Sequence, residues 1–301
     1  MNPRDSWFRT AILICMLLSL PVQAHAEAQK SGLRFGLLPV GSTKLYYEVA
    51  GEGAPVVLLH GGWLNSEQWD EQFSSLSRRY LVVRYDFRGA GRSLLGEAEW
   101  NHYDDLAALL KGLGIERAHL VGLSAGGQIA IDFAITHPEA VLSIAIGASP
   151  LRGYDLGQEF TDGMRGVIAG GVADDPQLIH DRMWAFAPFR VASTLPHARQ
   201  RLNAMIVHQN QWATSRPNAP RPKPFDPPPA ARLKDIEVPT LVIVGDGEMP
   251  ALQKEASFVA QSIPGARLVR VKDAGHFVNL EQPQRYNEII LDWLQRQERR
   301  K

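Results

Sequence analysis

The stretch His119-Leu-Val-Gly-Leu-Ser-Ala-Gly-Gly-Gln128 decides the fold of this chain. An apolar run of strand length leads into it and apolar residues at helical spacing follow it, so the serine in its middle lies at a strand-to-helix corner. Gly122 and Gly126 flank Ser124 in the pattern Gly-x-Ser-x-Gly, as expected where side chains would clash in a strained turn that holds a hydroxyl out of the sheet. We interpret Ser124 as a candidate nucleophile and the backbone N–H of Ala125 as a candidate oxyanion donor.

The composition limits the classes of function. The chain has 301 residues, 45% of them hydrophobic, and a formal net charge of zero. This length can bury a large core, and it suits one large domain with an insertion or two small domains. No basic run is present in the sequence, which argues against nucleic acid as a partner. No glycine-rich phosphate-binding pattern opens a helix, which argues against a nucleotide cofactor.

Residues 1–26 have the pattern of a secretory signal peptide and not of a folded segment. Arg4 and Arg9 give a positive start, an apolar run follows, and Ala24-His25-Ala26 is an Ala-x-Ala cleavage signal. The apolar run is shorter than the roughly twenty residues that a membrane span needs; an uncleaved membrane anchor is the alternative. We predict cleavage after Ala26, a secreted or periplasmic location and no membrane span in the mature chain. Because Cys15 is the only cysteine, the mature chain would have neither a disulfide nor a thiol nucleophile.

The rest of the chain alternates between strand-like runs and helical patterns. The predicted strands are 34–40, 44–49, 55–59, 80–85, 118–123, 141–146, 239–244 and 267–271. The predicted helices are 66–77, 104–113, 128–136, 252–263 and 284–296. This alternation favours an α/β fold in which a mostly parallel, doubly wound sheet is covered by helices on both faces. In such sheets the binding crevice lies at the carboxyl ends of the strands.

A second glycine-rich loop follows the predicted strand 55–59. It has the sequence His60-Gly61-Gly62-Trp63. Backbone N–H groups in a loop of this kind can point into a cavity, so we expect the N–H of Gly62 to be the second oxyanion donor. For His60 we expect a buried side chain that braces the loop by hydrogen bonds.

The pattern changes between residues 149 and 231, where short helical segments carry methionine and aromatic residues and residues 216–229 are rich in proline. We predict a helical cap inserted into a core domain made of residues 27–148 and 232–301. The apolar cap side chains form a small core of their own, line a pocket, or do both. The predicted pocket residues are Trp63, Met183, Trp184 and Phe186. The histidines of the cap do not keep a shared metal-ligand spacing, so no metal is expected.

Two acidic residues and a histidine follow the last two predicted strands. Asp246 and Glu248 come after the run 239–244, and His276 comes after the run 267–271. A serine hydroxyl is a poor nucleophile until a base takes its proton, and that base needs an acid to hold its tautomer. The order of serine, acidic loop and histidine supplies these three groups.

With these motifs in place, the chain resembles the α/β-hydrolase-fold serine hydrolases from about Gly36 to Trp293. The resemblance is carried by His60-Gly61-Gly62 with Trp69, by 86–93, by the corner around Ser124, by the strand that ends at Gly245, and by Gly275-His276 with Glu281-Gln282-Pro283. The family usually has its acid at the fourth position of a Gly-x-x-Asp turn, and that position is Glu248 here. The resemblance therefore favours Glu248 as the acid, with Asp246 as the alternative.

The resemblance implies acyl transfer on a small molecule, with no cofactor. Ser124 would attack a carbonyl after His276 takes its proton, and a carboxylic ester or lactone of small to medium size and apolar character is the expected substrate. Relatives that cleave carbon–carbon bonds, or that act as cofactor-free peroxidases, use the same three groups and remain alternatives. A ligand-binding protein of the same fold without catalytic activity is a further alternative.

Overall fold

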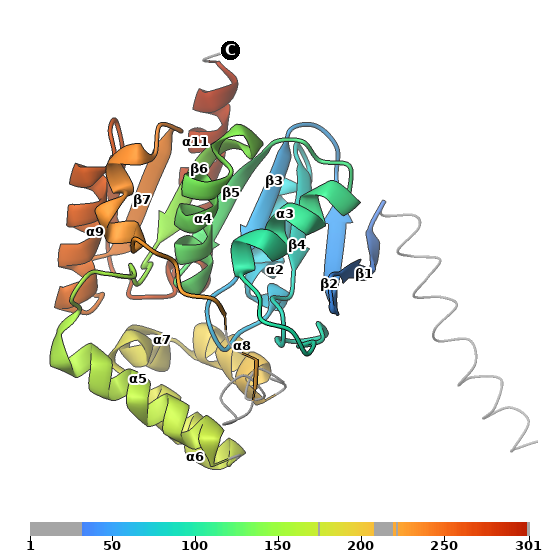
Figure 1. Cartoon of the computed structure of the whole chain (residues 1–301). Coiled ribbons are helices and arrows are strands. Elements are labelled where there is room, and N and C mark those ends of the chain that lie inside the picture. Colours follow the sequence, from blue (N-terminus) through green and yellow to red (C-terminus); the bar gives the residue numbers. More distant parts are fainter. Residues whose placement is uncertain (1–31, 174, 208–218, 221, 300–301) are drawn as a thin grey trace, which may run out of the picture.

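An eight-stranded sheet with the strand order β1-β2-β4-β3-β5-β6-β7-β8 runs through the middle of the molecule (Figure 1). The computed structural model describes residues 32–173, 175–207, 219–220 and 222–299. The predicted signal peptide lies outside these residues, and within them no helix is long and apolar enough to cross a membrane. The strands are β1 (Arg34–Val40), β2 (Thr43–Ala50), β3 (Pro55–Leu59), β4 (Leu81–Tyr85), β5 (Ala118–Leu123), β6 (Val141–Gly147), β7 (Thr240–Gly245) and β8 (Arg267–Val271).

The predicted mostly parallel sheet is confirmed. From β4 to β8 in the sheet order, every pair of neighbouring strands is parallel. The two N-terminal strands form an antiparallel hairpin that joins the sheet through β4. The loops with Gly62, Ser124, Glu248 and His276 follow the carboxyl ends of four of these parallel strands, namely β3, β5, β7 and β8. All four loops therefore lie at one edge of the sheet.

Helices cover both faces of the sheet. Those of the core are α2 (Asp70–Leu76), α3 (His102–Gly112), α4 (Ala125–Thr136), α9 (Pro250–Ser262), α10 (Val278–Glu281) and α11 (Pro283–Glu298). Single turns of 3-10 helix are η1 (Ser66–Trp69), η2 (Pro138–Ala140), η5 (Pro229–Ala231) and η6 (Leu233–Asp235). α4 packs on β5 and β6 and α9 on β7, whereas α2 packs on β4 and on α11. The helix after Ser124 begins at Ala125, three residues before the predicted start at residue 128. The prediction began late because it followed the apolar pattern, and the glycines in the first turn carry none.

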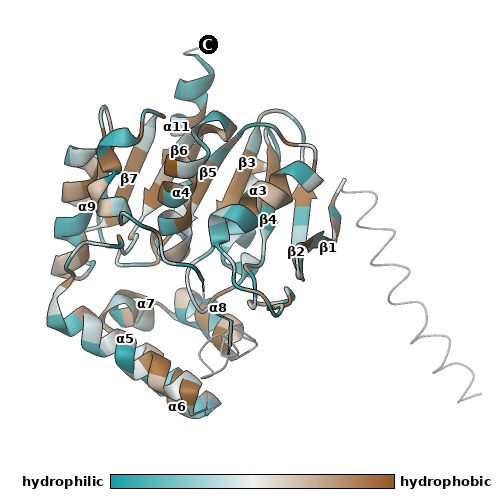
Figure 2. Ribbon diagram, viewed as in Figure 1, coloured by the Kyte–Doolittle hydropathy of each residue, from teal (hydrophilic) through white to brown (hydrophobic). Residues whose placement is uncertain are grey.

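Each strand of the central sheet contributes to two apolar cores. Val56 and Leu58 lie with the residues of α2 and α11, while Val57 and Leu59 lie with those of α3 and α4. All four side chains are fully buried, and each contributes about 1.5–3 kcal/mol of burial free energy. Figure 2 shows the central strands in hydrophobic colours, with hydrophilic residues on the outer surface of α9. Strands buried on both faces are the reason for the continuous apolar runs in the sequence.

The chain leaves the sheet between β6 and β7 and forms a cap of α5 (Gly157–Val172), α6 (Pro176–Ala185), the 3-10 turn η3 (Ala187–Phe189), α7 (Arg190–Thr194) and α8 (Pro196–Val207). Figure 1 shows α5 to α8 together at one end of the sheet, apart from α3, α4 and α9. The predicted insertion, 149–231, includes residues 174, 208–218 and 221, which lie outside the described part of the chain.

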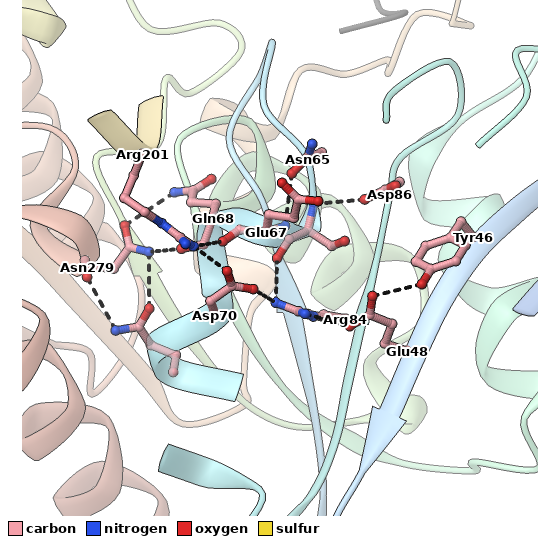
Figure 3. A network of polar contacts seen from close by, with 12 residues as sticks. Tyr46, Glu48, Asn65, Glu67, Gln68, Asp70, Arg84, Asp86, Arg201 and Asn279 are labelled. Carbon is pink, nitrogen blue, oxygen red and sulfur yellow. Dashed lines mark hydrogen bonds and ion pairs between the residues drawn. The ribbon is translucent and has the colours of Figure 1, made fainter. Parts of the chain in front are cut away.

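Apolar and charged contacts both join the cap to the core. The cap side chains Met183, Phe189 and Leu202 belong to the same buried cluster as Phe277 of the core. Arg201 of α8 forms an ion pair with the carboxylate at the start of α2 and donates to a backbone carbonyl of η1, as Figure 3 shows. Because this arginine is 42% exposed, the ion pair contributes little to stability.

Candidate active site

Ser124 lies at the corner between β5 and α4 in a strained backbone conformation. Its φ of 55° is in the left-handed region that residues other than glycine seldom adopt. Its N–H donates to Gly147 O at 2.8 Å. A Cβ at Gly122 would lie 2.3 Å from Gly126 O, and a Cβ at Gly126 would lie 2.0 Å from Leu59 O. Both contacts are too short for any side chain, so the structure confirms the predicted reason for the two glycines.

The two predicted oxyanion donors lie in neighbouring segments. A Cβ at Gly62 would contact the Cβ of Ala125 at 3.6 Å, and one at Gly61 would contact the Cβ of Ser124 at the same distance. The loop after β3 therefore packs against the first residues of α4. The N–H of Ala125 is at the N-terminus of that helix, where the backbone dipoles favour negative charge.

His60 braces this loop, as predicted. Its ring is fully buried and stacks on Phe87 with 3.7 Å between the ring centroids. Nδ1 donates to Gly61 O at 2.7 Å, and Nε2 accepts from the N–H of Phe87 at 3.0 Å. Burial lowers the pKa of His60 to about 4, so the ring is neutral near pH 7 and the two hydrogen bonds set its tautomer.

The buried pair of Glu248 and His276 is the central contact of the site. Oε2 of the glutamate lies 2.7 Å from Nδ1 of the histidine, and the two side chains are 0% and 5% exposed. The other carboxylate oxygen accepts the N–H of Met249 at 2.7 Å. Asp246 is exposed, and its N–H bonds to Val271 O on β8. Of the two acidic residues that the sequence left open, Glu248 is thus the one in contact with the histidine.

Backbone contacts hold the loop with the acid against the loop with the histidine. The N–H of Gly247 donates to Ala274 O at 2.8 Å. A Cβ at Gly245 would lie 2.1 Å from the same carbonyl oxygen, so only glycine allows the two loops to approach this closely. This approach brings a glutamate and a histidine that are 28 residues apart into direct contact.

Glu281 is a second buried carboxylate beside the histidine, and sequence reasoning gave it no role beyond a place in a family motif. It accepts the N–H of Gly275 and, at 3.4 Å, the N–H of Phe277. These are the two residues that flank His276. Burial raises the pKa of Glu281 to about 7, while the two backbone hydrogen bonds and the nearby histidine act in the opposite direction. The carboxylate thus fixes the backbone on both sides of His276.

A cavity of about 480 Å³ lies under the cap, and Ser124, His276, Gly62 and Ala125 all line it. Its volume falls in the range that is usual for small-molecule sites. Most of the remaining wall is apolar and is formed by the side chains of Trp63, Leu156, Phe160, Met164, Phe186, Phe189 and Phe277. Phe160 and Phe186 contact each other with their ring centroids 5.4 Å apart.

The predicted pocket residues divide into two groups. Trp63 and Phe186 line the cavity beside Ser124. Met183 does not, because it lies inside α6 and is fully buried in the apolar interior of the cap. Trp184 borders a different cavity of about 360 Å³ on the cap surface. Its indole N–H donates to Asn203 Oδ1 of α8 at 2.9 Å. These positions correct the prediction for Met183 and Trp184, whereas Phe186 reaches the cavity because it follows the end of α6.

The cap histidines take part in separate local contacts. His180 Nε2 lies 3.2 Å from Asn203 Oδ1, and His197 Nε2 lies 3.0 Å from Leu280 O. His208 lies outside the described residues. Within the described ranges, no group of three or more histidine, cysteine, aspartate or glutamate side chains could hold a metal ion.

Comparisons with known proteins agree with this architecture. The chain is 29% identical over 287 residues to the 2-hydroxy-6-oxononadienedioate/2-hydroxy-6-oxononatrienedioate hydrolase of Paraburkholderia phymatum, covering 90% of this chain and 97% of that protein. It is 28% identical to the carboxylesterase YbfK of Bacillus subtilis, covering 89% and 95%. The solved structure of a thermophilic esterase from Thermogutta terrifontis matches with a TM-score of 0.73 and 26% identity, covering 88% and 99%. The sequence pattern described as "Alpha/beta hydrolase family" matches residues 56–289, and the chain therefore belongs to the alpha/beta hydrolase family.

Proposed function

We propose that this protein is a serine hydrolase that cleaves a carboxylic ester or lactone of small to medium size and apolar character. The observation that carries the proposal is the 2.7 Å contact between Glu248 and His276 in the wall of a cavity that Ser124 also lines. Its relatives include a carboxylesterase and an esterase, which favours an ester over other substrates of the family. The apolar side chains of the cavity favour an apolar acyl or alcohol group.

The proposed reaction proceeds in two steps through an acyl-enzyme. Glu248 accepts a hydrogen bond from the Nδ1–H of His276 and so holds the tautomer in which the lone pair of Nε2 is free to take the proton of Ser124 Oγ. As that proton moves, Oγ bonds to the carbonyl carbon, and the N–H groups of Gly62 and Ala125 stabilise the oxyanion. Collapse of the intermediate breaks the bond to the leaving oxygen, which takes the proton from Nε2. A water molecule, which gives a proton to Nε2, then attacks the acyl-enzyme in the same way. The carboxylic acid product leaves, and Ser124 Oγ regains its proton.

A second candidate, cleavage of a carbon–carbon bond with the same three residues, draws support from the similarity to the hydrolase of P. phymatum. The name of that relative gives a dioate as its substrate, and Arg152 lines the cavity. This arginine forms an ion pair with Asp132, whose side chain is 3% exposed, so its charge is largely compensated. We therefore rank ester hydrolysis first.

The experiment that tests the proposal uses a fluorophosphonate probe together with p-nitrophenyl esters of two to eight acyl carbons. Labelling and hydrolysis are expected for the wild type and not for Ser124→Ala. His276→Ala should lower kcat by about four to six orders of magnitude, because the base is lost. Ser74→Ala is the matched control, since Ser74 is an exposed serine on α2. If the folded wild type neither reacts with the probe nor cleaves the esters, the proposed hydrolase activity is contradicted. That result would support the alternative of a ligand-binding protein without catalytic activity.

We also propose that residues 1–26 direct export and are removed. The proposal is supported by the charged start, the short apolar run and Ala24-His25-Ala26. N-terminal sequencing of the exported protein is expected to begin at Glu27. A product that keeps Met1 and stays with the membrane fraction would indicate the uncleaved anchor instead.

A further inference from the structure

Hydrogen bonds on both sides hold Gly61, the residue before the proposed oxyanion donor. Its N–H donates to Gln68 Oε1 at 2.7 Å, and its carbonyl accepts from His60 Nδ1 at 2.7 Å. The same carbonyl also accepts the N–H of Leu64 at 3.4 Å. The carbonyl of Gly61 and the N–H of Gly62 belong to one planar peptide group and point in opposite directions. A bond that fixes the Gly61 carbonyl therefore also fixes the direction of the Gly62 N–H. The bond from Gln68 fixes the preceding peptide group, so the loop is held on both sides.

Gln68 belongs to a buried network of side-chain amides, part of which Figure 3 shows. Its Nε2 donates to Asn279 Oδ1 at 3.3 Å, and Asn279 Nδ2 donates back to the Gln68 carbonyl at 3.0 Å. Asn279 Nδ2 also lies 3.3 Å from Gln72 Oε1. Gln72 Nε2 in turn donates to Asn279 O at 3.3 Å and to Asn287 Oδ1 at 3.0 Å. The first three amides in this network are fully buried: Gln68, Gln72 and Asn279.

The network connects two parts of the site that the sequence separates by 211 residues. Gln68 lies in η1, directly after the oxyanion loop. Asn279 lies in α10, three residues after His276. Amides carry no charge and do not titrate, so these hydrogen bonds persist at any pH at which the protein is folded.

We propose that Gln68 and Asn279 are positioning residues that hold the N–H of Gly62 and the imidazole of His276 at a fixed separation. This inference rests on the proposed function, because it assigns these amides to the geometry of acyl transfer. An apolar pair of similar volume would fill the same space, but it would leave the buried N–H of Gly61 without the acceptor that Gln68 provides. The amides therefore also contribute to stability, and the test must separate that contribution from positioning. The oxyanion site gains from the amides because its donors must be oriented before the charge develops.

The test compares Gln68→Met and Asn279→Leu with the control Gln297→Met. Gln297 is a buried glutamine on α11, and its amide donates to Trp293 O within the same helix. Gln68→Met and Asn279→Leu are each expected to lower kcat by about 10- to 100-fold, because the oxyanion donor loses its orientation. KM should change by less than about threefold, since ground-state binding depends on the apolar cavity. The control should keep kcat within about threefold of wild type, as expected for a change away from the site.

Two further readouts separate a positioning role from a structural one. Phenylboronic acid forms a tetrahedral adduct with an active serine, so its Kd should rise in proportion to the loss of kcat. The pKa in the pH profile of kcat/KM should stay as in wild type, because the contact between Glu248 and His276 is untouched. The double variant should be about as slow as the slower single variant, because both changes break one connection.

The outcomes distinguish the two proposals. A wild type that fails to react with the fluorophosphonate probe defeats the hydrolase itself. A reactive wild type with folded variants that keep kcat and boronate affinity within about threefold overturns the inference alone. If neither variant folds, Gln72→Met is the third variant, because it weakens the network while Gly61 keeps its bond to Gln68. Its kcat is expected to fall by about three- to tenfold, and an unchanged kcat again overturns the inference.

Discussion

Replacing Glu248 by glutamine tests the most specific part of the site. The substitution keeps the shape of the side chain and changes one oxygen to an NH₂ group. Oε1 is the buried acceptor for the N–H of Met249, and that N–H would be left unpaired if the amide turned its nitrogen toward it. We therefore expect the amide oxygen to stay on Met249 and the NH₂ group to face Nδ1 of His276.

The expected loss follows from the tautomer of His276. In the proposed mechanism, Nδ1–H of the wild type donates a hydrogen bond to Glu248, and Nε2 is the free base. Opposite an NH₂ group, Nδ1 must accept, so the ring proton moves to Nε2 and the base is no longer available. The imidazolium of the transition state also loses its buried counter-charge, because both side chains are at most 5% exposed. We expect kcat to fall by about 10³- to 10⁴-fold, which corresponds to about 4–5.5 kcal/mol of transition-state free energy.

The assay measures initial rates on p-nitrophenyl butyrate, with Asp246→Asn as the matched control. Asp246 is exposed, so its neutralisation should leave kcat within about threefold of wild type. Thermal melting of both variants shows that the comparison is made on folded protein. The reasoning is refuted if Glu248→Gln keeps more than about a tenth of the wild-type kcat, or if Asp246→Asn is the variant that loses activity.

Two predictions concern stability. Gly126→Ala should lower the unfolding free energy by about 2–3 kcal/mol or more in urea titrations, because the new Cβ would meet Leu59 O at 2.0 Å. Gly166→Ala is the control, since the atom nearest to its new Cβ is 3.6 Å away. Its unfolding free energy should stay unchanged or rise by up to about 1 kcal/mol. Burial raises the pKa of Glu255 from 4.5 to about 8, so the folded state holds a proton that the unfolded chain releases, and its contribution to stability is lost as the pH rises through that window. Glu255→Gln, which can still accept the N–H of Leu151, should match the wild type near pH 4.5 and exceed it by roughly 2–4 kcal/mol near pH 8; equal stability of the two proteins at both pH values would contradict this.

Much of the fold could be predicted from local patterns. Strands such as β3 and β7 are buried on both faces, and this burial produces continuous apolar runs that are visible in the sequence. The corner at Ser124 was predictable for another reason, since the strain at its φ of 55° and the close contacts around it leave few residue types possible. In both cases the physical requirement acts on consecutive residues.

The parts that could not be predicted depend on contacts across the chain. The family pattern favoured Glu248, but the residues alone did not exclude Asp246, because the two follow the same strand two residues apart and the turn between them decides which one faces His276. Met183 and Trp184 were predicted to line the pocket and do not, because helical spacing does not reveal which side of a cap helix faces the crevice. Gln68 was missed because a lone glutamine carries no motif, and its partner lies 211 residues away.

The shared interior of cap and core limits how this protein can be recombined with its relatives. Met183 and Leu202 of the cap lie in one buried cluster with Phe277 and Leu280 of the core. A chimaera that exchanged the inserted helices alone would set foreign side chains against these two core residues and leave gaps in the apolar filling, each costing up to several kcal/mol. Grafts that carry residues 277–281 together with the cap helices avoid that mismatch. Exchanging the cap of this protein therefore also changes the packing beside His276.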